Sequence, residues 1–138
     1  MMKQTKINLL FPVLLLCFSC GNVATDEAVI EAITPAEANR LLNLNQEIMV
    51  LDVRTPEEYE AGHIEGAVNI SVYAENFNTQ VNQLDKNKTY IVHCAANVEN
   101  GRSAKSINIM TDAGFKDIMS LEGGFTRWQS EGFDVSDQ

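Results

Sequence analysis

Short runs of β-branched and apolar residues alternate along this chain with segments that carry helix signals. We expect strands at residues 29–33, 47–52, 66–70, 89–93 and 118–121. The second and fourth runs, EIMVLD and TYIVH, are rich in apolar residues throughout, as is typical of strands buried on both faces. Strands separated by helices of about ten residues need crossover connections. The pattern therefore predicts an α/β fold with a mostly parallel central sheet and helices on both faces.

Two Thr-Pro pairs mark the first two helix starts. Thr34 and Thr55 can cap a helix with their hydroxyl groups. Each is followed by a proline, which fits the first turn because an N–H has no helical partner there. We expect helices at 36–44, from 56 to a stop at Gly62, and at 77–84, 103–113 and 125–129, with a turn at 123–124.

The first 19 residues have the pattern of an export signal. Lys3 and Lys6 precede an apolar stretch at 7–18, which is too short for a stable membrane span. The segment 17–21 (CFSCG) resembles a bacterial lipoprotein signal, in which Cys20 is acylated and becomes the first residue. Ordinary cleavage after Gly21 is the alternative. We expect a signal peptide at 1–19, a tether at 20–27 and one domain at 28–138, exported to the periplasmic side or cell envelope and anchored by lipid at Cys20.

The chain is acidic, with a formal net charge of −9 at pH 7. Such a charge argues against nucleic acid and against an anionic membrane surface as partners. We attribute the acidity to solubility. We expect a monomer whose membrane contact is made through the lipid anchor alone.

Of the three cysteines, Cys94 is the one left free if the signal peptide removes Cys17 and lipid caps Cys20. A single thiol in an exported protein is either buried and inert or kept for its reactivity. Cys94 directly follows the strand expected at 89–93. Because ligands of parallel sheets bind beyond the carboxyl ends of the strands, this position favours a reactive cysteine.

The residues after Cys94 can form an anion-binding loop. Their main-chain N–H groups can converge on one point, and the helix that follows presents its positive end there. Arg102 could hold an oxyanion through two parallel hydrogen bonds. We therefore expect a lowered pKa for Cys94. Ser103 is interpreted first as the helix N-cap and second as a substrate ligand. The candidate loop consists of Ala95, Ala96, Asn97, Val98, Glu99, Asn100, Gly101, Arg102 and Ser103.

A series of short motifs resembles the rhodanese-like domain. In chain order they are LDVRTPEEY (51–59), GHI (62–64), GAVNI (66–70), Cys94, GRS (101–103), AGF (113–115), LEGGF (121–125) and Trp128. Each string is weak alone, but their order and spacing make the resemblance specific. It covers residues 28 to 135.

The resemblance implies a sulfurtransferase. Cys94 would take sulfane sulfur from thiosulfate or a persulfide donor, become a persulfide and pass the sulfur to a thiol or protein acceptor. The loop amides would stabilise charge, and no metal or organic cofactor is expected. Asp52 and Arg54 match family positions and are expected to pair or to cap nearby loops. His63 is expected to pack or hydrogen-bond rather than to catalyse.

The spacing around Cys94 departs from the family pattern. Active rhodaneses usually have four residues between the cysteine and the arginine, and the related phosphatases have five. Here the seven residues 95–101 intervene. Glu99 would repel an anionic donor if it pointed inward. A catalytically silent module for partner binding or redox sensing therefore remains an alternative, as does oxyanion chemistry on phosphate or arsenate.

Overall fold

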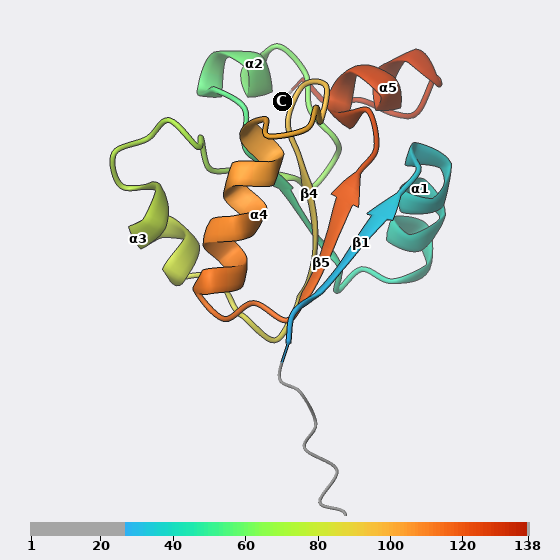
Figure 1. Ribbon diagram of the computed structural model, residues 1–138. Coiled ribbons are helices and arrows are strands. Elements are labelled where there is room, and N and C mark those ends of the chain that lie inside the picture. Colours follow the sequence, from blue (N-terminus) through green and yellow to red (C-terminus); the bar gives the residue numbers. More distant parts are fainter. Residues whose placement is uncertain (1–26, 138) are drawn as a thin grey trace, which may run out of the picture.

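The computed structural model describes residues 27–137 (Figure 1). The predicted signal peptide, the acylation site Cys20 and most of the tether lie outside the described residues. No helix within 27–137 is long and apolar enough to cross a membrane.

The described strands form one sheet in the order β1-β5-β4-β2-β3. Every neighbouring pair is parallel. The predicted α/β class with a parallel sheet is therefore confirmed. The strand bounds are β1 (Val29–Ile33), β2 (Met49–Asp52), β3 (Val68–Asn69), β4 (Thr89–His93) and β5 (Asp117–Leu121).

Helices cover both faces of the sheet, as the crossover pattern predicts (Figure 1). On one face, α3 and α4 pack on side chains that include Tyr90 and Val92 of β4. On the other, α1 and α5 pack on a second cluster that includes Ile91, the residue between them. The helix bounds are α1 (Pro35–Leu44), α2 (Pro56–Glu60), α3 (Phe77–Asn82), α4 (Arg102–Asp112) and α5 (Gly124–Ser130).

Both predicted threonine caps are present. Thr34 Oγ1 accepts from the N–H of Glu37 at 3.3 Å, with proline in the first turn of α1. At α2 the cap is reciprocal, because Thr55 Oγ1 accepts from Glu58 N and Glu58 Oε2 accepts from Thr55 N. These caps fix where the chain turns from the sheet into each helix.

Some predicted bounds were too long. The strand expected at 47–52 begins at Met49, because the side chain of Asn45 accepts from Glu47 N and holds residues 45–47 in a turn. The strand expected at 66–70 shrinks to β3, an edge strand that pairs with β2 through two residues. The helix expected at 77–84 ends at Asn82.

The expectation that Ser103 is an N-cap is wrong. Gly101 occupies that position, and the helix starts at Arg102 because Lys105 N already donates to Gly101 O at 3.0 Å. Ser103 is instead a fully buried residue of the first turn. Its hydroxyl is therefore free of capping and turns toward Cys94.

Candidate active site

Cys94 follows β4 directly and begins the loop that leads into α4. The carboxyl ends of the strands face the top of Figure 1, where this loop lies between α2 and α5. Cys94 is the free cysteine of the described residues and is 4% exposed. Cys94 is therefore a nearly covered thiol at the edge of the sheet where α/β proteins bind ligands.

The extra length of the loop is taken up by a separate turn. Gly101 N donates to Val98 O at 2.9 Å, which closes residues 98–101 on themselves. Asn100 adopts a left-handed φ of 56° inside the turn, a conformation that asparagine tolerates. A side chain on Gly101 would meet Val98 O at 2.8 Å, so the turn needs glycine there. Glu99 at the tip is exposed.

Main-chain donors from both sides of this turn surround the sulfur. The N–H of Asn97 donates to Cys94 Sγ at 3.3 Å, and the hydroxyl of Ser103 lies 3.4 Å from it. Burial raises the pKa of the Cys94 thiol. Hydrogen bonds to the ionised sulfur, from the Ser103 hydroxyl when it turns from Asn97 to the sulfur and from the N–H groups of Ser103, Asn97 and Ala96, outweigh burial and lower that pKa below its usual value.

The start of α5 holds the loop from the other side. Phe125 N donates to Cys94 O at 2.9 Å and Thr126 N donates to Ala95 O at 2.8 Å. This approach is possible because Gly124 has no side chain: a Cβ there would lie 2.5 Å from Cys94 O and 2.7 Å from Ala95 O. The GGF motif thus positions the main chain at Cys94 and Ala95.

Arg102 does not direct its fork at the sulfur. Its Nη1 and Nη2 bind Glu58 Oε2 at 2.5 Å and Oε1 at 2.9 Å. The hydrogen bonds from Arg102 lower the pKa of Glu58 to about 2, against a smaller effect of burial. The two parallel hydrogen bonds that we expected for an oxyanion are thus made to a carboxylate that also caps α2.

Beneath the loop lies a buried ion pair. Arg54 Nε and Nη2 bind the carboxylate of Asp52 at 2.6 to 3.0 Å, and Nη2 also donates to Gly62 O at 2.7 Å. The guanidinium stacks 3.9 Å from the ring centroid of Phe125. The pair therefore ties the end of β2 to the start of α5.

His93 and His63 flank this pair but face different ways. His93 is fully buried, and burial lowers its pKa, so its ring is neutral near pH 7. Its Nδ1 donates to Cys94 O at 3.2 Å. His63 stacks on Tyr59 with ring centroids 3.8 Å apart, and its main chain bridges to Ser136. The contacts of His63 therefore hold the chain end rather than the thiol.

Several residues of the site escaped the sequence interpretation. Glu58 was visible as the third residue of a capping box, but its pairing with Arg102 across 44 residues was not. Ser120 on β5 accepts from Asn97 Nδ2 at 3.0 Å, and no local pattern marks it. Among residues 27–137, no group of three or more histidine, cysteine or acidic residues could hold a metal ion.

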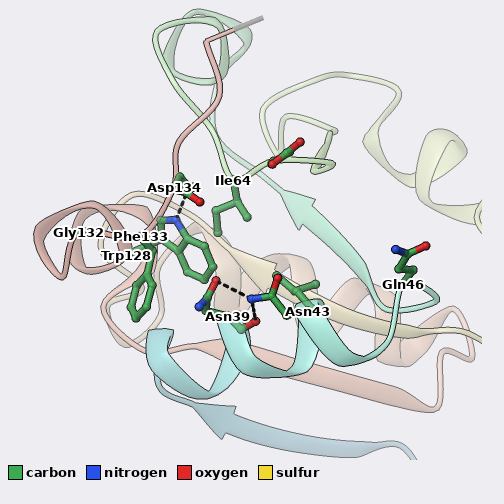
Figure 2. Close-up of a pocket in the computed structure, with 10 residues that line it drawn as sticks. Asn39, Asn43, Gln46, Ile64, Trp128, Gly132, Phe133 and Asp134 are labelled. Carbon is green, nitrogen blue, oxygen red and sulfur yellow. Dashed lines mark hydrogen bonds between the residues drawn. The ribbon is translucent and has the colours of Figure 1, made fainter.

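A separate pocket of about 480 Å³ lies between α1 and the segment after α5 (Figure 2). Figure 2 shows the amides of Asn39 and Asn43 beside Trp128 and Ile64. The lining contains no lysine or arginine and no residue of the loop 94–103. An anionic sulfur donor therefore meets no lysine or arginine counter-charge in this pocket, and the lining is separate from the loop that contains Cys94.

Comparison with known proteins identifies relatives of this chain. The family model for the rhodanese-like domain matches residues 34–131. The chain is 32% identical over 115 residues to the probable adenylyltransferase/sulfurtransferase MoeZ of Mycobacterium tuberculosis, which covers 81% of this chain and 29% of MoeZ. It therefore spans less than a third of that relative.

A shorter relative and a solved structure match in the same way. The chain is 28% identical over 92 residues to the thiosulfate sulfurtransferase GlpE of Shewanella oneidensis, covering 65% of this chain and 86% of GlpE. A crystal structure of a rhodanese-related protein from Thermoplasma volcanium superposes with a TM-score of 0.67 at 29% identity, covering 78% of this chain and 99% of that one.

Proposed function

Given that this chain belongs to the rhodanese-like domain family, we propose that it is a sulfurtransferase that uses a Cys94 persulfide. The observation that carries the proposal is the set of donors around Cys94 Sγ: the N–H groups of Ala96, Asn97 and Ser103 all stabilise negative charge there. They flank the turn at 98–101 rather than belong to it. The longer loop thus keeps the donors that a charged sulfur needs.

The proposed chemistry has two displacement steps. The Cys94 thiolate attacks the outer sulfur of thiosulfate, forming a Cys94 S–S bond while the S–S bond of thiosulfate breaks. Sulfite leaves with the bonding electron pair, and the persulfide carries the negative charge. An acceptor thiolate then attacks the outer persulfide sulfur, takes it as a new persulfide and restores the Cys94 thiolate. No oxidant or reductant is consumed in either step.

Each group near the sulfur has a part in this cycle. The main-chain N–H groups stabilise the thiolate before attack and the persulfide after it. Arg102 adds positive charge beside the site. Its Nη1 and Nη2 are hydrogen-bonded to Glu58, so they do not bind the donor in this arrangement. Because Cys94 is 4% exposed, the donor must approach a nearly covered sulfur. A sulfur this well covered favours a small donor, or a persulfide carried at the flexible end of a donor molecule.

The burial of Cys94 also favours a second candidate, a silent module that binds a partner or reports redox state. The same experiment separates the two. The protein is incubated with thiosulfate, and the peptide that contains Cys94 is analysed by mass spectrometry. A gain of one sulfur atom on Cys94, absent in Cys94→Ser and reversed by cyanide with release of thiocyanate, supports sulfur transfer. An unmodified peptide with thiosulfate and with a persulfide donor contradicts it.

We also propose that the protein is exported and acylated at Cys20. The support is the sequence pattern of residues 1–21, with two lysines before an apolar stretch and a small residue before the cysteine. Acyl chains stabilise membrane binding by roughly 0.8 kcal/mol per buried methylene, so more than one chain gives stable anchoring. The domain would then act at a membrane surface outside the cytoplasm.

A further inference from the structure

Ser103 shares one hydroxyl hydrogen between two possible acceptors. Its Oγ donates to Asn97 Oδ1 in a short hydrogen bond and lies 3.4 Å from Cys94 Sγ. Ser103 is fully buried, so bulk solvent does not reach its hydroxyl. A hydroxyl group has a single hydrogen, and this one is directed at the asparagine.

This arrangement fixes the protonation state that the site prefers. While Ser103 donates to Asn97, the contact between Cys94 and Ser103 can be a hydrogen bond only if the thiol S–H donates to Ser103 Oγ. Once Cys94 loses its proton, the sulfur needs donors, and Ser103 can serve it only by releasing Asn97. The side chain of Asn97 therefore favours the neutral thiol.

The main chain of Asn97 has the opposite effect. Its N–H donates to Cys94 Sγ at 3.3 Å and stabilises the thiolate. Asn97 has a left-handed φ of 48°, and the hydrogen bond from its Nδ2 to Ser120 Oγ at 3.0 Å keeps its amide oxygen beside Ser103. One residue thus carries two opposing influences on the same sulfur.

We propose that Asn97 is a positioning residue that restrains the ionisation of Cys94 by competing with the sulfur for the hydroxyl hydrogen of Ser103. The inference rests on the proposed function only in taking Cys94 as the reacting sulfur. With the Asn97 amide present, a larger fraction of Cys94 is protonated at a given pH than would be protonated without that amide. The persulfide, which also needs donors, meets the same competition.

The charged groups around the sulfur do not replace this competition. Arg102 is held by Glu58 and Arg54 by Asp52, so both guanidinium groups have carboxylate partners. His93 is neutral and donates to the main chain. Glu99 is exposed at the tip of the turn. The contributions of these groups to the pKa of Cys94 stay constant when the Asn97 side chain is removed.

The test is Asn97→Gly, which keeps the main-chain N–H and the left-handed φ but removes the amide. The rate of iodoacetamide alkylation is measured against pH on the peptide that contains Cys94. We expect the midpoint to fall by about one pH unit, roughly a tenfold gain in thiolate fraction below the midpoint. Asn100→Gly is the matched control, because Asn100 has a φ of 56° in the same loop. We expect no shift there.

Two further variants separate competition from loosening of the loop. In a Ser103→Ala background, Asn97→Gly should leave the midpoint unchanged, because the shared hydrogen is gone. Asn97→Asp should raise the midpoint, since a carboxylate accepts more strongly from Ser103 and adds negative charge. A fall that persists in Ser103→Ala would overturn the proposal. So would a rise in Asn97→Gly, which would mean that the amide donates to Ser103.

Alkylation does not require sulfur transfer, so the two proposals can fail separately. If Asn97→Gly lowers the midpoint but the protein never gains a persulfide from any donor, the restraint stands and the sulfurtransferase proposal fails. If the persulfide forms but the midpoint is unmoved, the restraint fails and the sulfurtransferase proposal stands.

Discussion

The contact between Gly124 and the Cys94 main chain predicts a large and local cost for Gly124→Ala. The residue has a left-handed φ of 57°, where alanine costs about 1 kcal/mol more than glycine. An added Cβ would also lie 2.5 Å from Cys94 O and 2.7 Å from Ala95 O, which are backbone atoms held by the same helix.

Relief of those overlaps requires α5 to withdraw from the loop. The withdrawal breaks the hydrogen bonds from Phe125 N to Cys94 O and from Thr126 N to Ala95 O. Each is worth about 1 kcal/mol, so the total loss of unfolding free energy is about 3 kcal/mol. The sulfur donors shift with the main chain, and we expect the thiosulfate loading of Cys94 to fall as well.

Gly66→Ala is the matched control for this change. Gly66 has a φ of 75°, and an added Cβ meets nothing within 4 Å, so only the conformational cost of about 1 kcal/mol applies. Urea unfolding with linear extrapolation measures both variants. If Gly124→Ala is no less stable than Gly66→Ala, the close approach of α5 to the loop does not hold the site, and the reasoning is refuted.

Three further changes test other parts of the structure. Because the pKa of Glu58 is lowered to about 2, its ionised form contributes stability above about pH 4.5 that is lost as the pH falls toward 2. Glu58→Gln should therefore flatten the acid limb of the curve of unfolding free energy against pH. An unchanged limb would contradict the pairing with Arg102. Glu99→Gln should change the rate of thiosulfate loading of Cys94 by less than about threefold, and the difference should vanish in 1 M salt, because the carboxylate is exposed. A larger effect that persists in salt would mean that Glu99 points toward the sulfur. Cys20→Ala should abolish labelling by a fatty acid and partitioning into detergent, and labelling that persists would exclude acylation at this residue.

The fold could be predicted from the sequence because its signals are local. Thr55 and Pro56 mark the start of α2 without reference to the rest of the chain, and the reciprocal cap with Glu58 lies within four residues. The run at 89–93 reads as a buried strand and is β4 with the same bounds. Strand ends were less predictable where a turn competes, as at Asn45, because a local side-chain hydrogen bond offers the backbone an alternative to the strand ladder.

The partners within the site were not predictable, because they are chosen by tertiary contacts. The position of Cys94 followed from the strand that precedes it, but the preference of Arg102 for Glu58 over the sulfur depends on where α2 lies above the sheet. Ser103 resembles an N-cap in sequence. It became a ligand of the sulfur because the turn at 98–101 moved the helix start to Arg102.

The length of the loop between Cys94 and Arg102 is therefore a poor measure of its chemistry. A loop accepts extra residues at little cost when they satisfy their own hydrogen bonds at the surface, and the turn closed by Gly101 N and Val98 O does so. The donors to the sulfur come from Ala96, Asn97 and Ser103, before and after that turn. The three extra residues therefore leave the donors that stabilise charge on Cys94 in place, and the length of the loop alone does not decide whether the site can hold a charged sulfur.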